Sequence, residues 1–226
     1  MLYKNVIEGY FVSRQNRFIA IVNINGNEEV CHVKNTGRLR ELLLPNAKVV
    51  VALADNPNRK TKYDLIGVYK NDVLFNIDSQ VVNKVFEEWI SSSNYFKNIK
   101  LIKPEYKYKD SRLDFYIEAD NKKHLIEVKG VTLEMDGIAK FPDAPTLRGI
   151  KHINTLVESS KDGFIPHIVF VIQFKGANSF EPNKETHPKF AEALLYSKQE
   201  NVDIIALDCI VKNNSIVIDK FVSTNI

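Results

Sequence analysis

The chain has 226 residues, 44% of them hydrophobic, and a formal net charge of +3 at pH 7. This size suits one large domain or two small ones, and the apolar fraction is sufficient for hydrophobic cores. No apolar run approaches the roughly 18 residues of a membrane-spanning helix, and the N-terminus has no cleavage signature, so we expect a cytoplasmic protein without a membrane segment. The only cysteines, Cys31 and Cys209, lie far apart in apolar stretches, which favours two buried thiols in a reducing compartment.

Residues 1–80 consist of short apolar runs separated by turn signals, among them Asn25-Gly26. We predict about five short strands, with a short helix over residues 38–44 after the third strand and an exposed loop over residues 55–60. This order matches the oligonucleotide-binding (OB) fold, a small β-barrel. The sequence therefore predicts an OB-like nucleic-acid-binding barrel over residues 1–80.

The charge of the chain is distributed unevenly. Residues 1–84 contain 12 Lys and Arg against 8 Asp and Glu, a net charge of +4, whereas residues 85–226 contain 19 against 20, a net charge of −1. Several basic side chains fall at strand ends and loops of the predicted barrel, where a nucleic-acid groove could collect them. These residues are Arg14, Arg17, Lys34, Arg38, Arg40 and Arg59. Ordinary solvation of loop charges remains the alternative for part of this set.

Residues 81–226 alternate between helical and strand-like patterns, which predicts a second domain of the α/β type, or α+β for the whole chain. The expected helices cover residues 81–90, 147–162 and 188–200. The expected strands cover residues 99–108, 112–118, 124–131, 168–172 and 202–210, with an edge strand at 215–218. Residues 134–145 are rich in turn formers and are expected to form a loop. The arrangement predicts a mixed sheet flanked by helices.

Acidic residues are placed on two of these strands in a way that suggests chemistry. Asp114 and Glu127 lie on successive strands of an expected hairpin, and Lys129 shares the strand face of Glu127 because side chains alternate. A further acid, Glu105, lies just upstream. Two carboxylates and an ammonium group could hold a hard divalent cation and orient a water molecule at a phosphodiester. The alternative is the charged outer face of a solvated sheet.

The expected helix from Leu147 follows the acidic strands and separates its residues by face. Leu147, Ile150 and Ile153 belong to an apolar stripe, and Thr146 could cap the N-terminus. A polar face carries Arg148, Lys151 and His152, which could clamp a phosphate. A solvated surface helix is the alternative.

Five segments together resemble the sugar fermentation stimulation protein (SfsA) family: Asn35-Thr36-Gly37, Ser111-Arg112-Leu113-Asp114-Phe115, Ile126-Glu127-Val128-Lys129, Phe141-Pro142-Asp143-Ala144 and Thr146-Leu147-Arg148-Gly149-Ile150-Lys151-His152. The resemblance runs through nearly the whole chain. It implies a prokaryotic cytoplasmic DNA-binding protein with an N-terminal OB barrel and a C-terminal domain similar to the PD-(D/E)xK nuclease superfamily. In that superfamily's pattern Asp114, Glu127 and Lys129 occupy the core positions and Glu105 matches an additional acid, although Leu113 stands where the motif has proline.

Together these features predict a DNA-binding protein whose second domain carries a metal-dependent nuclease (phosphodiesterase) site. Asp114, Glu127 and Glu105 would bind Mg²⁺, with Mn²⁺ as a substitute, and Lys129 would orient the attacking water. The alternative is a non-catalytic DNA-binding regulator of sugar-metabolism genes on a nuclease scaffold. RNA remains open as a substrate, and the sequence is compatible with a monomer or a homodimer.

Overall fold

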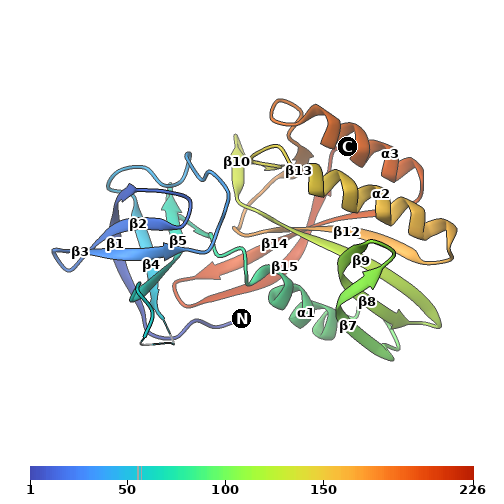
Figure 1. The fold of residues 1–226 in the computed structure, drawn as a ribbon, viewed down its shortest axis with the longest axis horizontal. Coiled ribbons are helices and arrows are strands. Elements are labelled where there is room, and N and C mark those ends of the chain that lie inside the picture. Colours follow the sequence, from blue (N-terminus) through green and yellow to red (C-terminus); the bar gives the residue numbers. More distant parts are fainter. Residues whose placement is uncertain (55, 57) are drawn as a thin grey trace.

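The computed structural model describes residues 1–54, 56 and 58–226, and in these residues the N-terminal part forms a closed β-barrel (Figure 1). Its strands are β1 (Val6–Arg14), β2 (Ile19–Ile24), β3 (Asn27–Val33), β4 (Lys48–Leu53), β5 (Tyr63–Lys70) and β6 (Val73–Asn76). The sheet order is β3-β2-β1-β4-β5-β6, and parallel pairing of β3 with β5 closes five strands into a barrel. The predicted OB barrel is confirmed.

Alternation of side chains explains how this barrel forms its core. In β2, Ala20, Val22 and Ile24 are buried while the residues between them are partly exposed. The turn into β3 uses Asn25 and Gly26, whose φ angles of 52° and 87° suit the tight hairpin turns that asparagine and glycine favour. The strands therefore present one apolar face to the barrel interior.

The prediction of a helix over residues 38–44 is wrong, because residues 40–42 form a turn and the rest of the segment has no regular structure. Leu39 has a φ of 50°, which breaks helical geometry, and it is nevertheless fully buried in the barrel core. The guanidinium group of Arg14 donates to the carbonyls of Gly37 and Arg38, which fixes the start of the segment in a non-helical shape. In the loop expected over residues 55–60, positions 55 and 57 lie outside the described residues.

The C-terminal part is a mixed nine-stranded sheet with helices on both faces (Figure 1). The order is β10-β11-β13-β15-β14-β12-β9-β8-β7. The strands are β7 (Leu101–Tyr108), β8 (Ser111–Ala119), β9 (Lys122–Val131), β10 (Leu133–Met135), β11 (Ile138–Phe141), β12 (Ile165–Ile172), β13 (Ser179–Pro182), β14 (Asp203–Lys212) and β15 (Ser215–Thr224). The helices are α1 (Val82–Ser92), α2 (Leu147–Lys161) and α3 (Pro188–Gln199). With the barrel, this gives an α+β chain, as predicted.

The two faces of the sheet belong to separate hydrophobic clusters. On one face, Phe86 of α1 packs with Val128 of β9 and Val169 of β12. On the other face, Ile153 of α2 packs with Phe170 of β12. Strand β12 is therefore covered on both sides, as its continuous apolar sequence predicted.

Three elements differ from the sequence expectations. Residues 134–145 are not a simple loop, because β10 and β11 form a hairpin within them. Strand β15 extends to Thr224 and pairs with both β14 and β13, so it is not at the edge of the sheet. Strand β13 was not expected.

Cys31 and Cys209 are free and buried, as predicted. Among the described residues, no helix is long and apolar enough to span a membrane.

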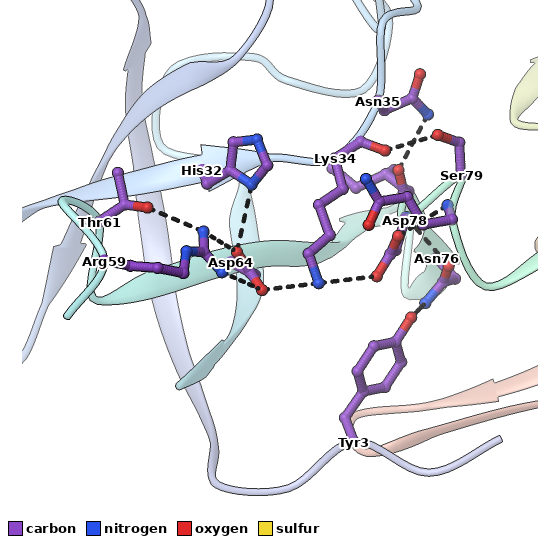
Figure 2. Close-up of polar contacts among 12 residues, drawn as sticks. Tyr3, His32, Lys34, Asn35, Arg59, Thr61, Asp64, Asn76, Asp78 and Ser79 are labelled. Atoms are coloured by element: carbon purple, nitrogen blue, oxygen red, sulfur yellow. Dashed lines mark hydrogen bonds and ion pairs between the residues drawn. The ribbon is translucent and has the colours of Figure 1, made fainter. Parts of the chain in front are cut away.

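A polar network within the barrel surrounds Asp64 and Asp78 (Figure 2), and one side chain of the C-terminal domain joins this network at Asn76. The side chain of Gln173, which follows β12, donates to Asn76 Oδ1 at 2.9 Å and to the carbonyl of Asp78 at 3.1 Å. Lys34 of the barrel lies 2.8 Å from Asp64 and 3.7 Å from Asp78. Burial raises the pKa of Asp78, which is 1% exposed. The two domains are thus held by directional hydrogen bonds as well as apolar contact.

Candidate metal and nucleic-acid site

The predicted acidic pair meets at the point where β8 and β9 stop pairing. Their register runs from Phe115 opposite Ile126 toward the turn, so Asp114 lies just beyond the ladder. There Asp114 Oδ2 accepts the N–H of Val128 at 2.7 Å, and Asn83 of α1 donates to Oδ1 at 2.8 Å. The carboxylate of Asp114 is therefore held from a strand and a helix.

Glu127 is the most buried acid of the site, with 2% of its side chain exposed. Its Oε1 accepts hydrogen bonds from Lys129 Nζ and from His152 Nδ1, whereas its Oε2 has no hydrogen-bond partner among the described residues. Burial would raise the pKa of Glu127, but the hydrogen bond from His152 and the charge of Lys129 outweigh it and lower this pKa. Glu127 is accordingly an ionised, buried carboxylate with one oxygen unused.

The pKa of Asp114 is shifted in the opposite direction to that of Glu127. Burial, and then the neighbouring charge of Glu127, raise the pKa of Asp114, although the hydrogen bonds from Val128 and Asn83 oppose this shift. Two carboxylates whose charges repel each other in a buried place form an environment that a cation stabilises. The described residues contain no group of three or more His, Cys, Asp and Glu suited to a metal. The site therefore offers two carboxylates, which is a ligand number that Mg²⁺ accepts because it retains several waters.

The structure does not bring Glu105 to the other acids. Its side chain is 73% exposed and pairs with Arg112 at 3.2 Å. Glu105 has a φ of 50° within β7, whose pairing with β8 keeps its register from Pro104 opposite Phe115 to Tyr106 opposite Leu113. The backbone of Glu105 therefore lies near Asp114 in the register of the two strands, but the carboxylate of Glu105 is exposed to solvent.

Helix α2 brings one candidate site residue, His152, to the acidic pair. Thr146 caps the helix as predicted, because its side chain accepts the N–H of Gly149 at 3.0 Å. His152 is 5% exposed and faces Glu127, so it does not share a solvent-facing polar surface with Arg148 and Lys151, and the prediction for this residue is corrected. Arg148 and Lys151 are exposed, and Lys151 pairs with Asp110 at 2.9 Å.

The basic residues of the barrel divide into two groups. Arg14 donates to four backbone carbonyls, and Lys34 and Arg59 both pair with the buried Asp64. These three cations stabilise the barrel itself, and their role in a nucleic-acid groove stays a prediction. Arg17, Arg38 and Arg40 are exposed, and their side chains form no ion pair within the described residues.

Comparisons with known proteins agree with this architecture. The SfsA N-terminal OB domain matches residues 12–77, and the sugar fermentation stimulation protein RE domain matches residues 80–215. The chain belongs to the SfsA family. A sugar fermentation stimulation protein homolog of Clostridium beijerinckii is 57% identical over 98% of each chain, and one of Desulfitobacterium hafniense is 51% identical over 100% of this chain and 99% of its own.

A solved structure supports the fold of this family member. The structure of Pyrococcus furiosus SfsA in complex with Ca²⁺ superposes with a TM-score of 0.90 at 29% identity, covering 100% of this chain and 98% of that one. The arrangement of a barrel followed by a mixed sheet with three helices is thus shared along the entire chain.

Of the residues that hold the two carboxylates, sequence reasoning missed Asn83 and gave His152 a different contact. Asn83 holds Asp114 but is one polar residue in an amphipathic helix, so nothing in its sequence context distinguishes it. His152 was singled out, but its contact with Glu127 depends on how α2 is rotated against the sheet. Thr155, one turn further on, is buried as well and bonds to Ser111 at 2.9 Å, which shows that this side of α2 faces the sheet.

Proposed function

We propose that this protein is a metal-dependent phosphodiesterase that acts on nucleic acid, with Asp114, Glu127 and Lys129 as its catalytic residues. The observation that carries the proposal is the buried Oε2 of Glu127, which has no partner among the described residues beside the carboxylate of Asp114. Buried carboxylate oxygens are normally satisfied, so an unsatisfied one calls for an explanation such as an absent ion.

Mg²⁺ is the cofactor that best suits these groups, with Mn²⁺ as a substitute. A divalent cation between Glu127 and Asp114 would satisfy the free oxygen and relieve the repulsion that raises the pKa of Asp114. Carboxylate and carbonyl oxygens are hard ligands, and the site contains no thiolate. The relative from Pyrococcus furiosus, which was solved in complex with Ca²⁺, supports a site for a hard divalent cation in this family.

The groups around the site would have separate roles in phosphodiester hydrolysis. Mg²⁺, when bound, supplies Lewis-acid stabilisation of the charge that develops on the phosphoryl oxygens. Lys129, which otherwise pairs with Glu127, orients the attacking water and stabilises the same negative charge from the side. His152 fixes the carboxylate of Glu127 from the opposite side, and Asn83 fixes that of Asp114.

We propose nucleic acid as the substrate because the active domain is joined to an OB barrel. OB folds bind oligonucleotides through their surface grooves. The exposed cations Arg17, Arg38 and Arg40 on the barrel and Arg148 and Lys151 on α2 would contact phosphates. DNA is the substrate that we expect, and RNA is the alternative that the assay distinguishes.

Incubation with single- and double-stranded DNA and RNA in Mg²⁺, Mn²⁺ or EDTA tests the proposal. We expect cleavage with either metal and none in EDTA, and a loss of at least about a hundredfold in Asp114→Asn and Lys129→Ala, because charge stabilisation of this kind is worth that much. Glu118→Gln removes an acid from the same strand outside the site and should cleave like the wild type.

Thermal denaturation with and without Mg²⁺ provides a readout independent of cleavage. Mg²⁺ should raise the midpoint of the wild type and leave that of Asp114→Asn unchanged, since a ligand stabilises only the form that binds it. Glu105→Gln should retain the wild-type response because its carboxylate is exposed. Salt-sensitive binding of intact strands, with no metal-dependent products, would instead identify a non-catalytic DNA-binding protein.

A further inference from the structure

A cleft of about 630 Å³ separates the barrel from the C-terminal domain, next to the metal site but distinct from it. The barrel contributes Arg17, Ser79 and the loop 35–38, and the C-terminal domain contributes residues 140–146 and the end of β9. This volume lies in the range of roughly 300–1,000 Å³ that is typical of sites for small ligands. It suits a unit of nucleotide size rather than a duplex.

The cleft carries an excess of positive charge drawn from both domains. Arg17, Arg38 and Lys140 line it, against a single carboxylate, Asp143, so three cations and one anion leave a net charge of +2. The side chains of the three cations make no ion pair or hydrogen bond with any residue that the structure describes. Asp143 is already engaged, because its Oδ2 accepts the backbone N–H of Arg38 at 2.9 Å. An anion would therefore find unused donors here.

The barrel side of the cleft is held in a fixed shape. Arg14 clamps the loop by donating to the carbonyls of Asn35 and Gly37, each at 2.9 Å, and the side chain of Asn35 accepts the N–H of Gly37 at 2.7 Å. A Cβ at Gly37 would lie 2.8 Å from Asn35 Oδ1 and still closer to Asp143 Oδ2, so a larger residue would have to displace two side chains that hold the loop. Because the loop is ordered before any ligand arrives, binding costs little conformational entropy.

The opposite wall of the cleft is apolar. It is formed by Phe141, Pro142, Ala144 and Pro145. The ring of Phe141 is partly exposed and is supported by Phe170 behind it, with ring centroids 5.6 Å apart. Apolar and aromatic surfaces of this kind bind the faces of bases with little regard to base identity.

We propose that this cleft binds one phosphorylated nucleoside unit, with its phosphate on Arg17, Arg38 and Lys140 and its base against the wall of Phe141. The inference rests on the proposed function, because it assigns this unit to the strand that the metal site cleaves. Gly130, which lines the cleft, directly follows Lys129, and Phe170 lies opposite Lys129 in the register of β9 and β12. A strand end in the cleft would therefore lie beside the scissile phosphodiester. A free nucleoside phosphate has the same chemistry and is the other source.

Binding in EDTA tests this inference without cleavage. The probes are a short oligothymidylate with a 5′-phosphate, one with a 3′-phosphate, one with neither, and free thymidine monophosphate. We expect the wild type to prefer one of the phosphorylated probes, and Arg38→Ala combined with Lys140→Ala to weaken that probe by at least about tenfold, the value of charge-assisted hydrogen bonds. Lys198→Ala combined with Lys220→Ala removes the same charge from exposed positions outside the cleft and serves as the matched control.

The outcomes separate this inference from the proposed function. Preference for a phosphorylated strand identifies a strand end, and equal binding of thymidine monophosphate identifies a free nucleotide; both support the cleft. If the double variant keeps the wild-type thermal midpoint and binds every probe like the wild type, the inference is overturned, even when metal-dependent cleavage persists. A third outcome is that the double variant loses phosphate-dependent binding while the wild type cleaves no substrate. This result would overturn the proposed function and support the binding site in the cleft.

Discussion

Identical carboxylates acquire opposite properties in this protein because their partners differ. Glu127 is surrounded by two cationic or hydrogen-donating side chains and has a lowered pKa, whereas Asp114 is held by neutral donors beside another charge and has a raised pKa. The alternation of residues along β9 was sufficient to predict that Glu127 and Lys129 share a face. Nothing in the sequence could predict that His152 joins them, because its contact is made between elements 25 residues apart.

A buried histidine outside the candidate site, His167, should also make the stability of the protein depend on pH. His167 is 2% exposed, contacts His124 at 2.9 Å, and has its Nδ1 at 3.2 Å from Asp203 without a hydrogen bond. Burial, and then the proximity of His124, lower the pKa of His167 to about 3. In the unfolded chain a histidine has a pKa of about 6.5.

This difference makes stability depend on pH in a defined direction. Below about pH 6.5 the unfolded chain binds a proton that folded His167 does not, so the free energy of unfolding should fall by up to about 1.4 kcal/mol per pH unit as the pH decreases toward 4. Chemical denaturation at several pH values checks this, with His167→Gln as the variant expected to show a smaller slope. Equal slopes in the two proteins would contradict the assignment.

At the scale of elements, helix α2 shows both what periodicity predicts and what it conceals. Its start at Leu147 and its cap at Thr146 followed from the sequence and are confirmed. Its buried face is wider than the apolar stripe because α3 and the sheet both cover it, so His152, Thr155 and Ser159 are buried with hydrogen bonds. Leu147, in contrast, belongs to the stripe but lies in the first turn, where it is 80% exposed.

The cap of α2 gives a prediction about stability. Thr146→Ala removes the acceptor of the Gly149 N–H and should lower the free energy of unfolding by about 1 kcal/mol. Thr146→Ser keeps the hydroxyl and should remain close to the wild type. Urea denaturation of the three proteins measures the difference, and an alanine variant as stable as the serine variant would show that the hydrogen bond contributes nothing.

For the whole molecule, the sequence predicted a barrel followed by a mixed sheet but could not give the long-range pairings. Strand β15 lies between β14 and β13 in the sheet. The four residues of β13 are too few for a hydrophobic pattern that would predict a strand. The sequence could not predict the hydrogen bonds between the domains either, since Gln173 and Asn76 are 97 residues apart in the chain. Such contacts arise only when both domains are folded.

These hydrogen bonds predict cooperative unfolding of the two domains. Gln173→Ala removes the side-chain donor that Asn76 Oδ1 and the carbonyl of Asp78 share, although Asn76 Oδ1 keeps the N–H of Asp78, and the loss should cost about 1–3 kcal/mol. Calorimetry should show one transition in the wild type and two in this variant, because the contact between the barrel and the sheet loses two of its hydrogen bonds. Gln199→Ala, the same change at an exposed position, should unfold like the wild type.

The left-handed backbone at Glu105 in β7 has a consequence for association between molecules at high protein concentration. Strand β7 is the outermost of its sheet, and its free backbone groups could recruit a strand from another molecule. Pro104 has no N–H to offer, and the left-handed bend at Glu105 breaks the straight row that such recruitment needs. Charged Lys103 and Lys107 are exposed along the same strand. The protein thus protects a nine-stranded sheet from edge-to-edge aggregation by a local distortion rather than by covering its rim.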